Sequence, residues 1–132
     1  MEEKQNEYKM YKKIYDKKLE VSIFGMGWIG LPTALIFANS GFSTTGVDIN
    51  RELIENLQLG KCHIDEPRVQ ELIKQNLNHT LRFTTDSEDA IKNSDLCIIC
   101  VPTPVSKNRT PNYDAIKKIS HTIGINLERE LC

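Results

Sequence analysis

The sequence predicts an α/β fold in which a doubly wound sheet of parallel strands carries helices on both faces. Three observations predict it. Short apolar runs of strand length alternate along the chain with segments of helical periodicity. A glycine-rich turn joins the first apolar run to the first helical segment. The last apolar run, residues 96–101, is apolar throughout, which is typical of a parallel strand covered on both faces. Right-handed crossovers between such strands give the strand order 3-2-1-4.

The first 18 residues form a highly charged leader, which we separate from a single, incomplete domain at residues 19–132. Tyr8, Tyr11, Ile14 and Tyr15 recur at helical spacing. The leader is therefore either a short amphipathic helix, packed on the domain or on a partner, or a frayed segment. We favour partial disorder.

Apolar runs and helix-end residues place the first half of the domain. Leu19–Phe24 is the first predicted strand and residues 43–48 are the second. Between them, Trp28–Ser40 is predicted to be helical, because Pro32 suits a first turn and Gly41 suits the position after the last turn. The buried face of this helix is expected from its large apolar residues, namely Ile29, Leu31, Leu35, Ile36 and Phe37.

Capping residues and a proline place the second half. Asn50 suits the N-cap of a helix, and Pro67 suits the first position of another. Asp86 or Ser87 can cap a shorter helix. The remaining predicted elements are helices at 51–59, 67–76 and 88–93, strands at 81–85 and 96–101, and a last helix that opens at Asn112 or Asp114.

The overall composition excludes several classes of function. Hydrophobic residues make up 39% of the 132 residues and charged residues 27%, which is an ordinary balance for one globular domain. The formal net charge of −1 suggests no nucleic-acid partner. No apolar run approaches the length that spans a membrane, and the charged N-terminus has no signal-peptide core. We therefore expect a cytoplasmic protein without a membrane partner.

Three glycines after the first strand have the spacing of a dinucleotide-binding turn, G-x-G-x-x-G. Gly25 would allow the tight turn, and Gly30 would let the helix pack closely on the strand. Gly27 has no Cβ, so a pyrophosphate could approach its backbone. The free N–H groups of the first helical turn, at the positive end of the helix dipole, would then face the phosphates.

Asp48 follows the second strand, about 20 residues after the glycines, where a ribose-binding carboxylate is expected. The alternative is an Asp that caps the next helix, as can follow any strand. We favour the ribose role because strand, glycines, helix, strand and acid occur in the required order.

Thr103 lies between Pro102 and Pro104, immediately after the last strand. With the order 3-2-1-4, this strand ends beside the glycine turn, where open α/β sheets bind ligands. The Thr103 hydroxyl and N–H could reach the ribose or the pyrophosphate. The alternative is a rigid strand exit with Thr103 facing solvent.

The cysteines and histidines do not have the spacing of a metal site. Cys97 and Cys100 are three residues apart in a strand, so they should point to opposite faces, which prevents chelation of one metal ion. We expect buried, reduced thiols that act as small hydrophobic side chains. No functional role is assigned to the other members of this group, which are Cys62, Cys132, His63, His79 and His121.

Four blocks of the sequence, in order, resemble the nucleotide-sugar 6-dehydrogenases. They are Phe24–Ala34, Gly46–Asn50, His63–Pro67 and Val101–Pro104, and Arg109–Tyr113 fits as well. From first to last they span nearly the whole chain after the leader. Within the family, the form of the third and fourth blocks most resembles the branch that oxidises UDP-N-acetyl-D-mannosamine, with the UDP-glucose branch as its nearest sibling.

The resemblance implies a Rossmann-like domain that binds NAD, and it implies which residues bind it: Gly25, Gly27, Trp28, Ile29, Gly30, Asp48 and Thr103. Asp48 would accept hydrogen bonds from the adenosine ribose, and its charge would disfavour the 2′-phosphate of NADP. Arg51 lies near enough to make NADP conceivable. Two positions depart from the family pattern, because Trp28 replaces a usual tyrosine and Arg68 replaces a glycine or a small acidic residue.

The resemblance also implies a reaction, the two-step oxidation of a sugar C6 alcohol to a uronate through a catalytic cysteine with Lys and Asn helpers. Those residues belong to central and C-terminal regions of the family that we do not find in this sequence, and none of its four cysteines lies in the nucleophile motif. We expect a fragment that is inactive alone. Its expected partner is a second copy of itself, in a homodimer, or a complementing catalytic chain. The UDP-sugar would bind only to the full-length enzyme. The alternatives are a stand-alone nucleotide-binding or interaction module and a regulator that senses NAD(H).

Overall fold

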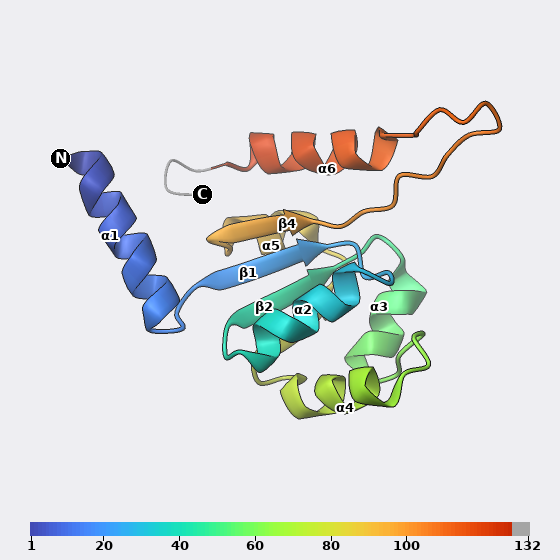
Figure 1. Ribbon diagram of the computed structural model, residues 1–132, viewed down its shortest axis with the longest axis horizontal. Coiled ribbons are helices and arrows are strands. Elements are labelled where there is room, and N and C mark those ends of the chain that lie inside the picture. The colour runs from blue at the N-terminus through green and yellow to red at the C-terminus, as the bar shows by residue number, and fades with distance from the viewer. Residues whose placement is uncertain (128–132) are drawn as a thin grey trace.

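The computed structural model describes residues 1–127, and in these the central element is a four-stranded sheet of parallel strands (Figure 1). The strands are β1 (Glu20–Phe24), β2 (Ser43–Val47), β3 (Leu81–Thr84) and β4 (Leu96–Ile99). They pair in the order β3-β2-β1-β4, so the predicted order is confirmed.

All four strands end in the same row of the sheet. Phe24, the last residue of β1, pairs with Val47 of β2 on one side and with Ile99 of β4 on the other. Val47 in turn pairs with Thr84, the last residue of β3. The segments that follow the strands therefore leave the sheet side by side at its carboxyl edge, which is where open α/β sheets bind ligands.

Capping side chains fix the helices close to their predicted bounds. Asn50 caps one helix by accepting from the Leu53 N–H at 3.1 Å, and Asp86 caps another by accepting from the Asp89 N–H at 3.1 Å. The helices of the domain are α2 (Gly30–Asn39), α3 (Arg51–Gln58), α4 (Pro67–Asn76), α5 (Ser87–Lys92) and α6 (Asp114–Ile125).

Two predicted bounds were wrong by two residues, and one predicted helix face was wrong in part. Helix α2 begins at Gly30 rather than Trp28, and β4 ends at Ile99 rather than Val101, because β1 has already turned away at Gly25. Ile29 and Ile36, expected on the buried face of α2, are exposed. Leu31 and Leu35 are buried as predicted, and the rest of the buried face consists of the small residues Gly30, Ala34 and Ala38, which allow close packing on the sheet.

Each face of the sheet has its own hydrophobic core. Successive residues of a strand point to opposite faces, so Ile23 enters the core beneath α2 and α4 while Phe24 enters the core beneath α5 and α6 (Figure 1). Ser22, which points to the second face, is also buried. Its hydroxyl bonds the Ala90 carbonyl at 3.3 Å and the hydroxyl of Ser94. Hydrophobic cores thus lie on both faces of β1.

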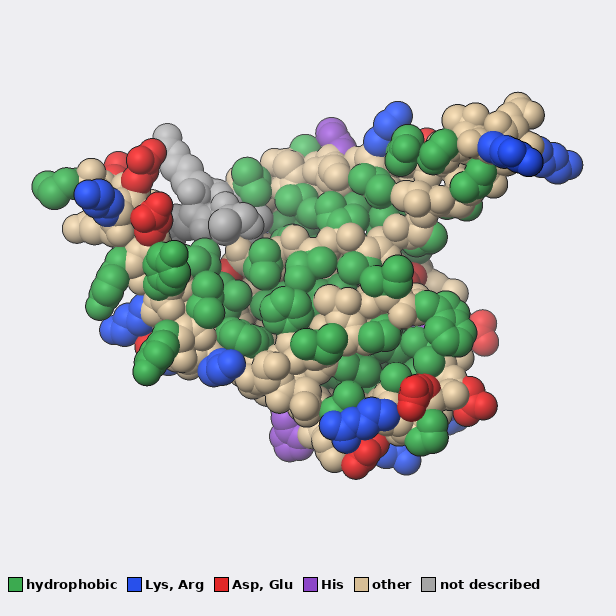
Figure 2. All heavy atoms as spheres, viewed as in Figure 1, with side chains coloured by type: hydrophobic (Ala, Val, Ile, Leu, Met, Phe, Trp, Pro, Cys, Tyr) green, Lys and Arg blue, Asp and Glu red, His purple; other side chains and the backbone are tan. Residues whose placement is uncertain are grey.

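The leader is helical, so the partial disorder that the sequence favoured is not what the structure has. Helix α1 (Glu2–Tyr15) has acidic residues in its first turn and lysines in its last turn, which suits the helix dipole. It meets the domain at Met10, which packs against the first core, and at Lys13, whose ammonium lies 2.7 Å from the Asp95 carboxylate. Figure 2 shows hydrophobic side chains along this helix, which has no buried residue.

Among residues 1–127 no helix combines the length and the apolar character that crossing a membrane requires.

Candidate functional site

The turn after β1 requires glycine at its first position. Gly25 has a φ of +102°, a backbone conformation that residues other than glycine rarely adopt. A Cβ on Gly25 would lie 2.5 Å from the carbonyl oxygen of Cys100, just past β4. The Gly25 N–H donates to the Val47 carbonyl at 2.7 Å. The turn is thereby fixed between the ends of β2 and β4.

Gly30, the first residue of α2, is required by packing. A Cβ there would lie 1.6 Å from the carbonyl oxygen of Gly25 and 3.3 Å from the Cβ of Cys100. The first turn of the helix therefore rests directly on the turn that leaves the strand. The sequence predicted this close approach, and only hydrogen at this position allows it.

Gly27 differs from the other two glycines of the motif. It is exposed, its φ lies outside the left-handed region, and a Cβ would meet no atom within 4 Å. Nothing in residues 1–127 therefore requires glycine at this position. The space in front of its backbone is open, so a ligand could approach the main chain closely there.

The backbone N–H groups around Gly27 are available to a ligand. Within residues 1–127, the amides of Gly27, Trp28, Ile29 and Gly30 donate no hydrogen bond. These amides open helix α2, whose first turn has no acidic side chain to neutralise the positive end of the dipole. Unpaired N–H groups and an uncompensated dipole make this helix start suitable for a phosphate group.

Asp48 is bound to the same turn. Its Oδ2 accepts from the Met26 N–H at 2.9 Å, and its Oδ1 accepts from the Asn50 N–H at 2.9 Å. The carboxylate is half-exposed and has no ion-pair partner in residues 1–127. Asn50, not Asp48, is the N-cap of α3, so the helix-capping alternative was wrong. Each carboxylate oxygen keeps a lone pair for a further donor, such as a hydroxyl.

Met26 and Gly46 also belong to this site, although neither was predicted as a site residue. The Met26 side chain is completely buried beneath the turn. A Cβ on Gly46 would lie 2.5 Å from the Met26 sulfur, so glycine in the middle of β2 makes room for it. A glycine inside a predicted strand was the available signal, because such a residue marks a close approach. Met26 thus fixes the turn over the end of β2, within reach of Asp48.

The other predicted site residues lie in the open. The side chains of Trp28 and Ile29 are 74% and 73% exposed beside the glycine turn. Thr103 is exposed as well, three residues past the contact between Cys100 and Gly25. It lies near the start of the segment 102–113, which extends away from the sheet edge before α6 (Figure 1). The structure thus brings Asp48 to the glycine turn, whereas Thr103 has no hydrogen bond to it within residues 1–127.

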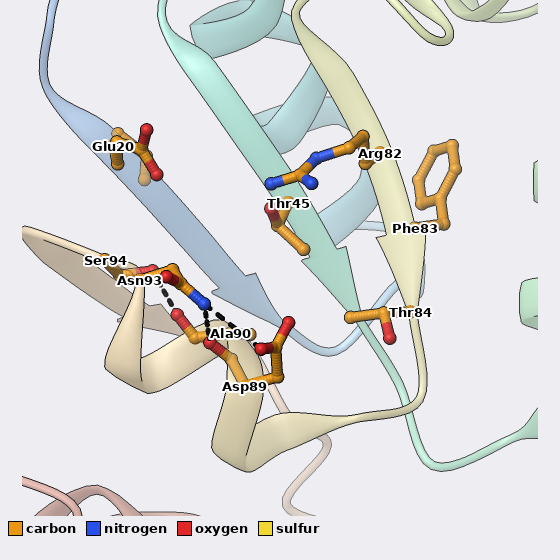
Figure 3. Close-up of a pocket in the computed structure, with 10 residues that line it drawn as sticks. Glu20, Thr45, Arg82, Phe83, Thr84, Asp89, Ala90, Asn93 and Ser94 are labelled. Atoms are coloured by element: carbon orange, nitrogen blue, oxygen red, sulfur yellow. Dashed lines mark hydrogen bonds between the residues drawn. The ribbon is translucent and has the colours of Figure 1, made fainter.

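A shallow pocket elsewhere on the molecule contains none of these residues. Figure 3 shows it on the face of the sheet beside α5, with Arg82 of β3 and Asp89 and Asn93 at α5 among its lining residues. The Asn93 amide donates to the Asp89 side chain at 3.1 Å. The candidate site is not this pocket but an open edge of the sheet.

The thiols of Cys97 and Cys100 pack in different cores, so the prediction that they point to opposite faces is confirmed. Burial raises the pKa of both thiols, and it also raises that of Cys62. Because the thiolate is the reactive form, a raised pKa leaves less of it at neutral pH. Cys132 lies outside the described residues.

These three thiols should react slowly with iodoacetamide. At about pH 7.5 we expect each to be alkylated more slowly than free cysteine, whose pKa is about 8.5. Their rates should still be rising at pH values where the rate of free cysteine has levelled off. Mass spectrometry of peptides after timed quenching would give the rate at each position. A thiol that reacts as fast as free cysteine at neutral pH would contradict the burial that the structure gives it.

A turn with unpaired amides at a helix start, and a carboxylate after the next strand, define the chain as a dinucleotide-binding α/β domain. The comparison with known proteins is more specific. The model of the UDP-glucose/GDP-mannose dehydrogenase family, NAD binding domain, matches residues 19–131, and the chain belongs to this family. The cofactor of the domain is NAD.

Known relatives are several times longer than this chain. The UDP-N-acetyl-D-mannosamine dehydrogenase of Pyrococcus horikoshii is 34% identical over 111 residues, which cover 84% of this chain and 26% of the relative. The GDP-mannose 6-dehydrogenase of Pseudomonas syringae pv. tomato is 38% identical over 107 residues, covering 80% and 24%. A crystal structure of GDP-mannose dehydrogenase from Pseudomonas aeruginosa superimposes with a TM-score of 0.78 at 33% identity, covering 83% and 25%. The chain thus spans about a quarter of the length of these relatives.

Proposed function

We propose that this chain provides the NAD-binding part of a nucleotide-sugar dehydrogenase that oxidises the C6 alcohol of UDP-N-acetyl-D-mannosamine to a uronate. One observation carries the proposal. In the part of the chain that the structure describes, the amides of residues 27–30 are unpaired, and a carboxylate is bound to the same turn; they offer complementary partners to a diphosphate and to a ribose.

Each residue of the site has a distinct role in this proposal. The N–H groups of Gly27, Trp28, Ile29 and Gly30 hold the diphosphate, and Gly25 fixes the turn that presents them. The Asp48 carboxylate accepts from the hydroxyls of the adenosine ribose. Thr103, on the far side of the site, approaches the cofactor from the end of β4. When bound, NAD would accept a hydride from the sugar alcohol, and this chain would orient it for that transfer.

The relatives support the choice of substrate. Several are UDP-N-acetyl-D-mannosamine dehydrogenases, from Pyrococcus horikoshii, Campylobacter jejuni and Methanococcus maripaludis. Others are GDP-mannose 6-dehydrogenases, and UDP-glucose remains the substrate of a further branch. In this proposal residues 1–18 are a leader and residues 19–132 the cofactor domain. The sugar site and the catalytic cysteine belong to the part of the relatives that this chain does not match.

Isothermal titration of the 132-residue chain tests the proposal. We expect NAD to bind, NADP to bind more weakly because Asp48 repels its 2′-phosphate, and a UDP-sugar alone not to bind. Equal affinity for NAD and NADP would overturn the role of Asp48. Absence of binding by either dinucleotide would overturn the proposed function as a whole.

Replacing Asp48 by alanine should weaken NAD binding by about 1–3 kcal/mol, the scale of hydrogen bonds to a charged group. Asp86 provides the matched control, because it also follows a strand at the carboxyl edge but caps α5. Asp86→Ala should lower stability by about 1 kcal/mol through the lost cap, while its NAD affinity stays the same. Titration calorimetry and urea denaturation of both variants give the two quantities. Unchanged NAD affinity in Asp48→Ala would show that this carboxylate does not hold the ribose.

A further inference from the structure

The Asp48 carboxylate is held by two N–H groups of different origin. The N–H of Asn50 donates to Oδ1 at 2.9 Å, but Asn50 is only two residues away, so this bond orients the carboxylate within its own segment. The N–H of Met26 donates to Oδ2 at 2.9 Å across 22 positions. Within residues 1–127 this is the side chain's one bond to the glycine turn. The direction of the carboxylate relative to the turn therefore depends on where Met26 lies.

The side chain of Met26 anchors this N–H. The turn is bonded to β2 through the Gly25 N–H, whereas the amides of residues 27–30 donate no hydrogen bond within residues 1–127. The Met26 side chain, by contrast, is completely buried in the core beneath α2, together with Phe83 of β3. A buried apolar side chain resists removal to water. It therefore fixes the part of the turn that the backbone leaves free.

Gly46, in the middle of β2, makes the space for this side chain. A Cβ on Gly46 would lie 2.5 Å from the Met26 sulfur and 2.8 Å from a ring carbon of Phe83. The sulfur thus lies where a side chain at position 46 would otherwise point. Gly46 is buried, and β2 pairs with β1 on one side and with β3 on the other. The contact therefore belongs to the interior of the sheet and not to an open edge.

We propose that the packing of Met26 on Gly46 determines the preference of this site for NAD over NADP. The inference rests on the proposed function and adds the residues that control its specificity. A carboxylate aimed at the ribose accepts from the ribose hydroxyls and repels a phosphate on the 2′-oxygen. Without the Met26 N–H, it could rotate toward solvent, which would weaken both effects. Met26 and Gly46 are thus positioning residues that act on the cofactor through Asp48.

Two substitutions of Met26 differ in whether they reach Gly46. Leucine has carbons at the δ position, where the sulfur lies, whereas valine ends at the γ position. Met26→Leu should keep the NAD preference of the parent chain, because exchanges between Met and Leu conserve volume. Met26→Val should weaken NAD binding about tenfold, the scale of one lost hydrogen bond to a charged group, and NADP binding less than about twofold. Calorimetric titration gives the ratio of the two dissociation constants.

Gly46→Ala changes the same contact from the other side. Its methyl group would displace the Met26 sulfur and the Phe83 ring, so both the NAD preference and the urea concentration of unfolding should fall. Should this variant fail to fold, the two Met26 variants still decide the question.

Ile73→Val is the control for lost stability, because Ile73 of α4 is completely buried in the same core. It should unfold at a lower urea concentration but keep the NAD preference of the parent chain. A general loss of packing changes stability, whereas a change of the ratio requires a change at Asp48. A Met26→Val variant with the parent ratio would overturn the inference. So would an Ile73→Val variant whose ratio falls as far as that of Met26→Val.

Hydrogen exchange measured by NMR without nucleotide separates this inference from the proposed function. In the parent chain, the Met26 N–H should be protected about tenfold more than those of Gly27 and Trp28, which donate no hydrogen bond within residues 1–127. The difference should persist in Met26→Leu and disappear in Met26→Val. Equal protection of the three amides in the parent chain would overturn the inference whether or not NAD binds. A parent chain that protects Met26 but binds neither dinucleotide would instead overturn the proposed function, and with it the preference.

Discussion

Replacing Gly30 by alanine should lower the free energy of unfolding by about 3 kcal/mol or more, the upper range of overpacking effects. The added Cβ would lie 1.6 Å from the Gly25 carbonyl oxygen, and this atom belongs to the backbone. It cannot rotate away like a side chain, so either the first turn of α2 or the turn after β1 must move. Both carry the candidate site, and NAD binding should be lost together with stability. Urea denaturation followed by circular dichroism gives the change.

Gly124 supplies the control for this substitution. It lies in α6, and a Cβ there would meet no atom of the described residues within 4 Å. Gly124→Ala should keep the stability of the parent chain or raise it by about 0.5–1 kcal/mol, because alanine favours the helix. Should Gly30→Ala unfold at the same urea concentration as Gly124→Ala, the close contact between α2 and the turn would not exist in solution.

The second large effect is expected at Gly27, where substitution should weaken NAD binding rather than lower stability. Gly27→Ala should leave the free energy of unfolding nearly unchanged, because the Cβ would meet no atom of residues 1–127 within 4 Å. It should nevertheless weaken NAD binding about 10- to 100-fold, or about 1.4–2.8 kcal/mol, because the methyl group would occupy the space of the diphosphate. Calorimetric titration and urea denaturation of the same sample separate the two effects. A variant that binds NAD like the parent chain would show that the diphosphate lies elsewhere.

The three glycines of the turn separate residues that the fold requires from a residue that the function requires. At Gly25 and Gly30 a Cβ would clash with other atoms of the chain, so any protein with this turn would need glycine there. At Gly27 a Cβ would clash with no atom of residues 1–127. Its glycine is therefore best explained by a molecule that the chain binds. The spacing of the motif does not show which glycine the fold requires, and the structure does.

The strand order, the glycine turn and the position of Asp48 beside this turn could be predicted because their signals are local. Apolar runs, capping residues and the glycine spacing each occupy a few neighbouring positions, and parallel crossovers then leave few possible orders. Asn50 and Asp86 cap the helices that the sequence assigned to them. The register that aligns Phe24 with Val47 and Ile99 was not predictable in this way, because it depends on packing between segments distant in the sequence.

Other features could not be predicted, because they depend on contacts between distant residues. The bond between Asp48 and the Met26 N–H joins residues 22 positions apart, and it needs the gap that Gly46 leaves in β2. Helix α1 is ordered partly by the ion pair of Lys13 with Asp95, 82 positions later. Ile36 was placed on the buried face of α2 because of its size, whereas packing distance selected the smaller Ala34 and Ala38 instead.

The role of Thr103 stays a prediction. The structure puts it at the beginning of an exposed segment at the carboxyl edge, next to the strand end that contacts Gly25. Thr103 could contact NAD only if the segment 102–113 approached the cofactor, whereas Asp48 already lies at the turn. We therefore propose that Asp48 and the amides of residues 27–30 rank above Thr103 as ligands of NAD.

The measurement that addresses this ranking most directly is a titration of the ¹⁵N-labelled chain with NAD, followed by amide NMR spectra. The largest shifts should fall on the N–H groups of Gly27, Trp28, Ile29 and Gly30, because these donate no hydrogen bond within residues 1–127 and would acquire a phosphate partner. The N–H of Met26 should shift next, through its bond to Asp48. If saturating NAD left the NMR signals of these five amides unshifted, or shifted only those of residues around the pocket beside α5, the site described above would be contradicted.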